Sequence, residues 1–413
     1  MTPVVRRLEA HELPLWLQCV PIPFLMPPRD DDGEPAPPGH WERHMELDRT
    51  WAVEDEGRFV GNGTTFSRTV TLPAATGSGC PVVPMAAFTG VGVQPTHTRR
   101  GLLRALMTEM LEDARGRDEP LAGLMASEGS IYGRFGFGVA TTAARYSIDT
   151  RDATFARPFD GPPVRLVGPN EAAELLPELF QGACAVQPGQ VNRTDAVWTE
   201  LFEDNPERRH GASPNWYGVC EGGYAIWRVE ARRTFSAASV TVVELVADRP
   251  QSEAALWRFI LNLDMVSDVV TARRPVEEPL RYRLADPRSL KTQEVRDVLW
   301  LRILDTPAAL CARQYERDGE LVLEVTSPQP DDPAAGRWVL HAESGKASCA
   351  PAGRSQAVDL SLGLAELSAM LAGGVKASVL CAGGLVDEGR LGALAEADAL
   401  FMSTPAPFTI VGF

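Results

Sequence analysis

The stretch "VGVQPTHTRRGLLRALMTEML", residues 91–111, decides the fold of the first part of this chain. A short run of β-forming residues enters a turn that contains a proline and leaves it as a helix. Apolar residues recur along that helix at intervals of three and four, at Leu103, Leu106, Met107, Met110 and Ala114. The pattern predicts a strand, a turn and an amphipathic helix with one buried face.

Three arginines, Arg99, Arg100 and Arg104, surround Gly101 in this turn, although the chain has a formal net charge of -15. The start of a helix exposes unpaired N–H groups and carries about half a positive charge. Glycine lets a ligand approach the backbone, and arginine makes paired contacts to phosphate oxygens. A solvated helix start with incidental arginines is the alternative. The cluster favours a bound anion.

Val91 and Val93 lie on one side of the predicted strand, and Pro95 soon after them cannot donate to a sheet. A strand that parts from its neighbour here leaves N–H and C=O groups free to pair with an extended arm that contains amides. An amide arm joined to a pyrophosphate describes coenzyme A. The G-x-x-x-x-G-K-[ST] and G-x-G-x-x-G motifs of other nucleotide sites are absent from this region.

The region around this stretch is predicted to be a sheet of antiparallel strands. Residues 45–72 alternate β-forming residues with two turn signals, Glu56-Gly57 and the glycine-rich 61–63. The length of 413 residues suggests two to four domains, and the Pro/Gly-rich segment 157–169 is the first candidate linker.

The chain contains a weak internal repeat. Residues 240–263 follow the same order of strand, proline-containing loop and helix as residues 86–110. In the second copy Gln251, Ser252 and Glu253 stand where the first has Arg-Arg-Gly, so we expect the second copy to have lost the anion site.

A third region begins near residue 286 and contains no obvious chemical motif. It is predicted to contain a helix within 292–311, strands at 319–326 and 336–343, and helices within 362–373 and 389–401. Segregated strands and helices favour an α+β layer. The domain boundaries that follow from these patterns are 1–156, 157–285 and 286–413.

Composition excludes several classes of function. Hydrophobic residues make up 44% and charged ones 23%, the balance of a globular protein, and the acidic charge argues against nucleic acid as a partner. The seven cysteines are dispersed without a C-x-x-C pair, and no apolar run is long enough to span a bilayer, so we expect a cytoplasmic protein.

His40 and His44 have a helical metal-ligand spacing, but a packed or solvated pair is preferred and no metal site is predicted.

The chain resembles the Eis (enhanced intracellular survival) branch of the GNAT N-acetyltransferases. The resemblance rests on "VQPTHTRRGLLRA" (93–105) and "LMASEGSIYGRFGFGVAT" (124–141), and extends weakly over the whole chain, including "LWLRILDTPAAL" (299–310). The family's coenzyme loop is [QR]-x-x-G-x-[GA]; here Thr98 and Leu103 stand at its ends and only Gly101 matches.

The resemblance implies an α+β fold with two tandem GNAT domains, the second without a working cofactor loop, followed by a sterol-carrier-like domain. It implies acetyl-CoA as co-substrate. The residues expected to bind it are Val91, Gly92, Val93, Arg99, Arg100, Gly101, Leu102, Leu103, Arg104, Ser127 and Glu128.

Acetyl transfer from a thioester to an amine needs two proton movements, and the resemblance assigns both. The amine must lose a proton, and the departing thiolate benefits from gaining one. Tyr132, in "IYGRFG", matches the family's general acid, and a phenol with a pKa near 10 is protonated at neutral pH. Packing under a loop is the alternative for Tyr132 and the preferred interpretation for Phe135 and Phe137.

The chain ends in "STPAPFTIVGF", whose apolar residues Phe408, Ile410, Val411 and Phe413 predict a packed tail. In Eis-like enzymes the C-terminal carboxylate is the general base, which carries over to Phe413. A docked strand with an incidental end is the alternative. Trp41 is a candidate wall of the substrate pocket, with core packing equally open.

The resemblance implies amine acceptors such as aminoglycosides or lysine side chains, and a homohexamer. A non-enzymatic carrier of acyl-CoA or lipid, with the first domain as a relic, is the competing hypothesis. The retained arginine–glycine turn and Tyr132 favour the enzyme.

Overall fold

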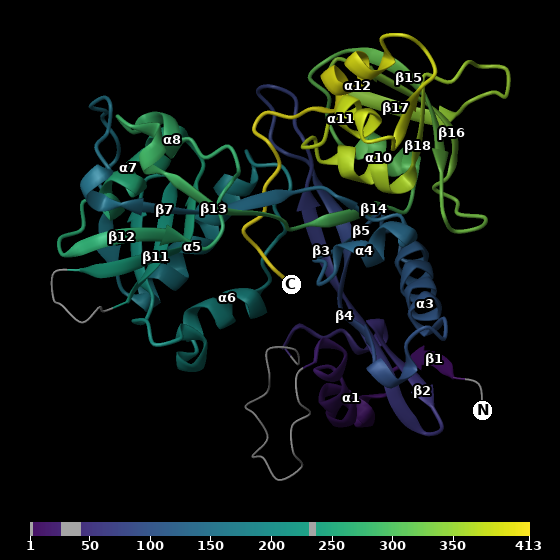
Figure 1. Cartoon of the computed structure of the whole chain (residues 1–413), viewed down its shortest axis with the longest axis horizontal. Coiled ribbons are helices and arrows are strands. Elements are labelled where there is room, and N and C mark those ends of the chain that lie inside the picture. The colour runs from purple at the N-terminus through teal and green to yellow at the C-terminus, as the bar shows by residue number, and fades with distance from the viewer. Residues whose placement is uncertain (1–2, 26–42, 231–236) are drawn as a thin grey trace.

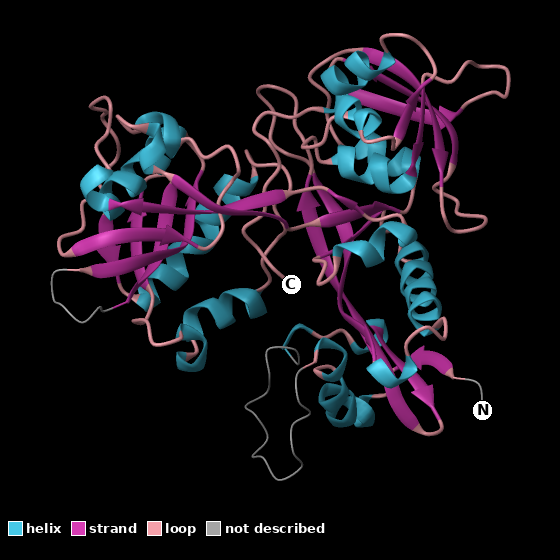
Figure 2. Ribbon diagram, viewed as in Figure 1, coloured by secondary structure: helices cyan, strands magenta, loops and turns pink. Residues whose placement is uncertain are grey.

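The computed structural model describes residues 3–25, 43–230 and 237–413. In this part of the chain the strands form three sheets, each accompanied by helices (Figures 1 and 2).

The first sheet holds the stretch 91–111. Its strands follow the order β1-β2-β3-β4-β5-β14-β6. Their bounds are β1 Val4–Arg7, β2 Thr50–Asp55, β3 Arg58–Thr71, β4 Val82–Val93, β5 Leu121–Leu124, β6 Gly138–Val139 and β14 Trp300–Ile303. β4 and β5 are parallel and are connected by α3 (Leu102–Gly116), while α1 (Leu13–Cys19) packs near β3.

Helix α3 confirms the predicted amphipathic helix. Its buried face consists of Leu102, Leu106, Met107, Met110, Leu111 and Ala114. Leu103 is only partly buried, and Glu109 and Glu112 are exposed on the other side. Burial of a large apolar side chain contributes roughly 1.5–3 kcal/mol, so this face holds the helix and the turn before it on the sheet.

The turn predicted at Glu56-Gly57 is confirmed, but the one predicted at residues 61–63 is wrong. These residues lie inside β3. A Cβ atom at Gly63 would lie 2.9 Å from the Met110 sulfur, and one at Gly61 would lie 2.9 Å from Val53 Cγ2. The two glycines therefore allow neighbouring side chains to approach the strand closely instead of turning the chain.

The second sheet follows the order β13-β7-β12-β11-β10-β9-β8. The strand bounds are β7 Thr142–Asp149, β8 Arg165–Val167, β9 Trp216–Cys220, β10 Gly223–Glu230, β11 Ala238–Ala247, β12 Val266–Thr271 and β13 Lys291–Asp297. The helices that accompany it are α5 Pro169–Cys184, α6 Asp195–Glu203, α7 Pro250–Leu261 and α8 Leu280–Arg283. The parallel pair β11–β12, joined through α7, repeats the arrangement of β4, α3 and β5, which confirms the predicted order of the repeat.

The third sheet has the order β17-β16-β15-β18-β19. Its strands are β15 Gly319–Thr326, β16 Gly336–Glu343, β17 Lys346–Pro351, β18 Leu360–Gly363 and β19 Val386–Glu388. Its helices are α9 Thr306–Ala312, α10 Leu364–Leu371, α11 Ala377–Ala382 and α12 Ala393–Phe401. The strands and helices expected at 319–326, 336–343, 362–373 and 389–401 are confirmed.

The helix predicted within 292–311 is mostly wrong. The segment forms β13 and β14, and only α9 at its end is helical. All four residues of β14 are buried between β5 and β6. A short apolar run with no polar face does not distinguish a central strand from a buried helix by its periodicity.

Three strands join sheets on the far side of the expected boundaries. β7 precedes residue 156 but lies in the second sheet. β13 and β14 both follow residue 286, but β13 lies in the second sheet and β14 in the first. The boundaries 1–156, 157–285 and 286–413 therefore stay predictions.

All seven cysteines are free thiols. Among the helices of the described ranges, none combines the length and the apolar character that crossing a membrane requires.

Candidate active site

The site begins where β4 and β5 part. The two strands pair only from Met85 to Phe88 on β4, with Phe88 opposite Leu124 at the end of β5. β4 continues to Val93, so over the described residues the β5-facing edge of residues 89–93 has no strand partner. The predicted strand opening is present in the fold.

A bulge produces this divergence. Asn62 pairs with Gly92 and Thr64 with Thr89, so Gly63 faces two residues of β4. Gly90 adopts a φ of 59°, a left-handed conformation that glycine accepts without strain. The Asn62 side chain donates to the Gly90 carbonyl. Sequence reasoning missed Asn62 because the glycines around it were interpreted as a turn.

The turn before α3 is open and uncapped. Arg99 has a φ of 63° and Gly101 a φ of 80°, and together they redirect the chain into the helix. Gly101 is the N-cap and supplies no side chain to bond the first turn. The N–H groups at this helix start are therefore available to an anion.

The three arginines of the turn differ in their contacts. Arg99 and Arg104 are exposed and have no hydrogen bond or ion pair within the part of the chain that is described. Arg100 Nη1 lies 2.9 Å from Asp55 Oδ2, and His97 Nε2 lies 3.5 Å from the same oxygen. Arg99 and Arg104 can thus meet an anion directly, whereas Arg100 must first leave Asp55.

Tyr132 lies beside the opening of the two strands. It ends the short helix α4 (Gly129–Tyr132) and is 6% exposed. Its ring packs edge-on against Phe137 at 6.2 Å, and Phe137 lies 6.0 Å from Phe88. Phe135 and Phe137 are buried in the same core, as expected for packing residues.

The surroundings of Tyr132 favour its protonated form. Burial raises the pKa of its hydroxyl above the ordinary value near 10, a hydrogen bond with Ser127 opposes this shift, and the charge of Glu128 adds to it. Ser127 and Glu128 are exposed and lie between the end of β5 and α4. Tyr132 therefore keeps its proton at neutral pH.

The C-terminal tail reaches the same place. Phe408, Ile410 and Val411 are 4%, 8% and 3% exposed, which confirms the predicted packed tail. A Cβ atom at Gly412 would lie 3.7 Å from the sulfur of Met125, the residue that directly follows β5. The partly buried Phe413 packs on the core cluster that Met125 also contacts, and the tail runs between the first two sheets (Figure 1).

Two of the weaker sequence candidates give no support for a site. Trp41 and His40 lie outside the described residues. His44 is buried, with its Nε2 3.6 Å from Glu200 Oε2 and its Nδ1 3.4 Å from an Arg68 nitrogen. Within the described ranges no group of three or more His, Cys, Asp or Glu could hold a metal ion.

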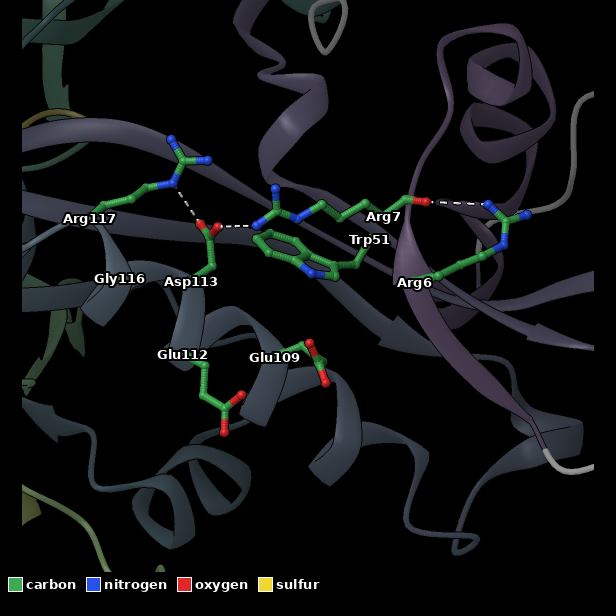
Figure 3. A pocket seen from close by; sticks show the side chains of 8 residues that line it. All are labelled: Arg6, Arg7, Trp51, Glu109, Glu112, Asp113, Gly116 and Arg117. Carbon is green, nitrogen blue, oxygen red and sulfur yellow. Dashed lines mark hydrogen bonds and ion pairs between the residues drawn. The ribbon is translucent and has the colours of Figure 1, made fainter.

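A separate pocket of about 530 Å³ lies at the other end of α3 (Figure 3). It is lined by Arg6, Arg7, Trp51, Glu109, Glu112, Asp113, Gly116 and Arg117. Its nearest lining residue on α3, Glu109, lies eight residues from Gly101, roughly 12 Å along the helix.

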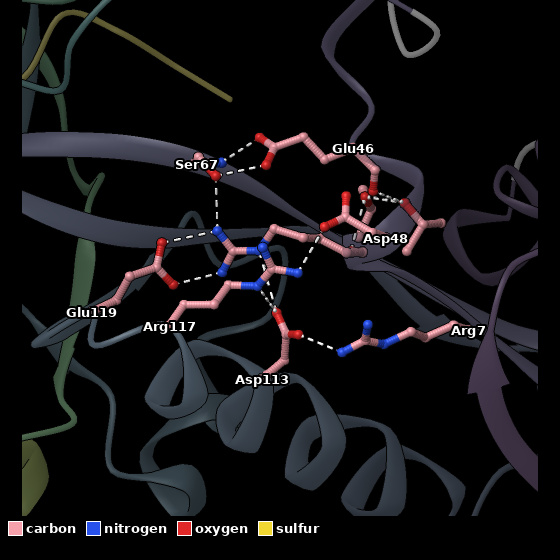
Figure 4. A network of polar contacts seen from close by, with 10 residues as sticks. Arg7, Glu46, Asp48, Ser67, Asp113, Arg117 and Glu119 are labelled. Carbon is pink, nitrogen blue, oxygen red and sulfur yellow. Dashed lines mark hydrogen bonds and ion pairs between the residues drawn. The ribbon is translucent and has the colours of Figure 1, made fainter.

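The arginines at this end of α3 are paired with carboxylates (Figure 4). Asp113 accepts from Arg7 at 2.7 Å and Arg117 at 3.0 Å and lies 3.3 Å from Arg49, which also binds Glu119. Each of these arginines is paired, so the network braces the end of α3 and offers a phosphate no free cation.

Comparisons with known proteins agree with this geometry. Models of GNAT acetyltransferase domains match residues 4–140 and 189–303, and a sterol carrier protein domain model matches residues 306–410. An uncharacterized N-acetyltransferase of Streptomyces coelicolor is 37% identical over 399 residues, 92% of this chain and 94% of that protein. N-acetyltransferase Eis of Mycobacterium tuberculosis is 34% identical over 330 residues, 78% of this chain and 79% of that protein.

The crystal structure of Eis1 from Mycobacterium abscessus superposes on the whole of this chain and covers all of its own, with a TM-score of 0.85 at 31% identity. The chain belongs to the Eis-like GNAT N-acetyltransferases. The predicted family, enzyme class and fold of two GNAT domains and a sterol-carrier domain are confirmed. The GNAT fold implies that this Eis-like enzyme uses acetyl-CoA, and the non-enzymatic carrier hypothesis is not retained.

Proposed function

We propose that this Eis-like enzyme transfers the acetyl group of acetyl-CoA directly to an amine of a polyamine-like acceptor, such as an aminoglycoside or a lysine side chain. Tyr132 is the general acid and the carboxylate of Phe413 is the general base. One observation carries the proposal: the open edge of β4, Tyr132 and the C-terminal tail meet at the end of β5.

Acetyl-CoA is held by two elements in this proposal. The backbone of Val91, Gly92 and Val93, on the open part of β4, pairs with the amides of the pantetheine arm. The pyrophosphate binds at the start of α3, through the N–H groups that follow Gly101 and the side chains of the three arginines. The remaining contributors are Leu102 and Leu103 at the helix start and the backbone of Ser127 and Glu128.

The transfer then needs two proton movements. The Phe413 carboxylate takes a proton from the substrate ammonium, and the freed nitrogen lone pair attacks the thioester carbonyl. The C–N bond forms, the C–S bond breaks, and Tyr132 gives its proton to the departing thiolate. An α-carboxyl with a pKa of about 3.3–3.7 is a weak base toward an ammonium, so desolvation or a relaying water must narrow the difference.

Further features belong to the proposal. Trp41 forms part of the acceptor pocket, and the domains divide at 1–156, 157–285 and 286–413. The protein works in the cytoplasm, where acetyl-CoA is available, and assembles as a homohexamer, as the resemblance to the Eis branch implies. The transfer uses no metal ion and no nucleic acid partner.

Calorimetry and a thiol-release assay test the proposal. Acetyl-CoA should bind the purified protein, and a panel of amines that includes aminoglycosides and lysine peptides should release free thiol from it. Mass spectrometry of the products identifies the acetylated nitrogen. The proposed function would be contradicted if acetyl-CoA did not bind, or if no amine of the panel gave turnover.

A further inference from the structure

We infer that the second GNAT unit acts as a clamp that positions the C-terminal carboxylate over the first unit. The clamp consists of the loop 187–191, between α5 and α6, and the side chain of Arg273 after β12. The inference rests on the proposed role of Phe413 as the general base, and makes the clamp residues positioning residues for that base.

The loop grips the tail through four hydrogen bonds. Gln187 Nε2 donates to the Ala406 carbonyl at 2.8 Å, and the Phe408 N–H donates to the Pro188 carbonyl at 2.9 Å. The Ile410 N–H donates to Gln190 Oε1 at 3.2 Å. The Val191 N–H donates to Thr409 Oγ1 at 3.4 Å. The tail is thus held at intervals from residue 406 to residue 410.

Arg273 holds the tail at the same point. Its Nη1 donates to the Ile410 carbonyl at 3.2 Å. Within the described ranges Arg273 has no ion pair and no other hydrogen bond. Arg273 therefore makes its polar contact with the tail. Arg273 binds the carbonyl of Ile410, and Gln190 accepts from the N–H of Ile410.

The loop is fastened to the catalytic sheet as well. The Gly189 N–H donates to the Thr71 carbonyl at 2.7 Å, the Thr71 N–H donates to the Gln190 carbonyl at 2.9 Å, and the Gln190 N–H donates to Thr71 Oγ1 at 2.9 Å. Val191 forms a bridge with Val70. Because Thr71 is the last residue of β3, the loop is bonded to the first sheet on one side and to the tail on the other, and it fixes the tail relative to this sheet.

Gly189 makes this close arrangement possible. It has a φ of 85°, and a Cβ atom there would lie 2.9 Å from Thr141 Cγ2 and 3.1 Å from the Phe408 nitrogen. The loop, the catalytic unit and the tail therefore meet around a position without a side chain.

The position of the clamp limits where the carboxylate can go. Val411 is the last buried residue of the tail, and two residues follow it. Two extended residues span at most about 7 Å. The Phe413 carboxylate is thereby confined near Met125 at the end of β5, and the unit that lacks the arginine–glycine turn supplies the placement of the base.

The test combines two losses, Gln190→Met and Arg273→Met, in one full-length variant. Each lost hydrogen bond should weaken tail docking by roughly three- to tenfold. Carboxypeptidase A should release Phe413 at least tenfold faster from the variant than from the parent enzyme, and kcat should fall by a similar factor. The KM for acetyl-CoA should stay within twofold. The single variant Gln190→Glu, which keeps an acceptor oxygen and the native Arg273, should retain most of kcat.

Arg258→Met is the matched control, since Arg258 lies in the same unit and its side chain, among the described residues, donates to the Phe159 carbonyl and lies over the Phe159 ring. It should leave release of Phe413 and kcat unchanged. Unchanged release in the double variant would overturn the clamp, whatever happens to kcat. Fast release with full kcat would instead overturn the base assignment on which the inference rests, even if acetyl-CoA turnover itself is confirmed.

Hydrogen exchange on the unmodified enzyme gives a second measurement if the double variant does not fold. The N–H groups of Phe408 and Ile410 should exchange at least a hundredfold more slowly than in a free peptide of residues 403–413. Exchange at the rate of the free peptide would also overturn the clamp.

Discussion

Replacement of Tyr132 by phenylalanine separates chemistry from packing at the candidate site. The ring and its edge-on contact with Phe137 at 6.2 Å remain, and only the hydroxyl is lost. The hydrogen bond with Ser127 disappears with it, which costs about 1 kcal/mol of folding stability. Loss of a general acid lowers kcat by about 10²–10⁴-fold, which corresponds to a barrier higher by roughly 3–5 kcal/mol.

The assay follows thiol release at saturating acetyl-CoA, with calorimetry for coenzyme binding and a thermal melt for stability. Tyr146→Phe is the control, because Tyr146 is a second buried tyrosine whose hydroxyl donates to the carbonyls of Pro275 and Val276 at 3.1 and 2.7 Å. It should lose about 1–2 kcal/mol of stability and keep its kcat. The Tyr132 variant should lose a similar amount of stability, but its kcat should fall by about 10²–10⁴-fold while its acetyl-CoA affinity stays unchanged.

The pH dependence gives a second check on the same residue. Burial raises the pKa of Tyr132 above its ordinary value near 10, so the acid stays protonated up to at least that pH. On the alkaline side, the kcat of the parent enzyme should fall as the pH rises through this raised pKa, and the phenylalanine variant should lack that fall. A Tyr132→Phe variant with full kcat and a lowered melting temperature would refute the role as acid and leave packing as its function.

Three other predictions concern the arginines, the base and the third unit. In initial-rate assays at low salt, the double variant Arg99→Ala/Arg100→Ala should raise the KM for acetyl-CoA about ten- to a hundredfold. Asp55→Ala removes the partner of Arg100 and should lower this KM. An unchanged KM in the double variant would place the coenzyme elsewhere. Deletion of Phe413, or residues appended after it, should abolish turnover but preserve acetyl-CoA binding, and a C-terminally tagged enzyme with full kcat would exclude this carboxylate. Arg313→Met should cost about 2–4 kcal/mol in denaturant unfolding without changing KM, because the buried Arg313 donates to the carbonyls at the ends of α10 and α12; equal stability would contradict this.

Local patterns in the sequence were enough to predict the elements that depend on neighbours along the chain. The apolar spacing of α3, the turn at Gly101 and the packed tail follow from residues close in sequence. The repeat of strand, helix and strand was likewise visible, because each copy builds its own local pattern. The anion turn and Tyr132 were visible as motifs, although their catalytic roles remain proposals.

Other features depended on which segments meet in space. The apolar run of β14 by itself predicts part of a helix, because it becomes a strand only between β5 and β6. The glycines at 61 and 63 look like a turn until Val53 and Met110 are packed against them.

The sequence by itself determined that this chain carries a helix with an open arginine–glycine start, a tyrosine in a glycine-rich loop and an apolar end. The tertiary structure alone decided that the tyrosine loop and the chain end meet at the end of β5, beside the open edge of β4 that leads to the helix start, and that loop 187–191 holds the chain end there. The physical reason is the range of the interactions. Helical periodicity and turn chemistry act over a few residues, whereas the hydrogen bond from the Ile410 N–H to Gln190 joins residues 220 positions apart, and no local pattern encodes such a partner.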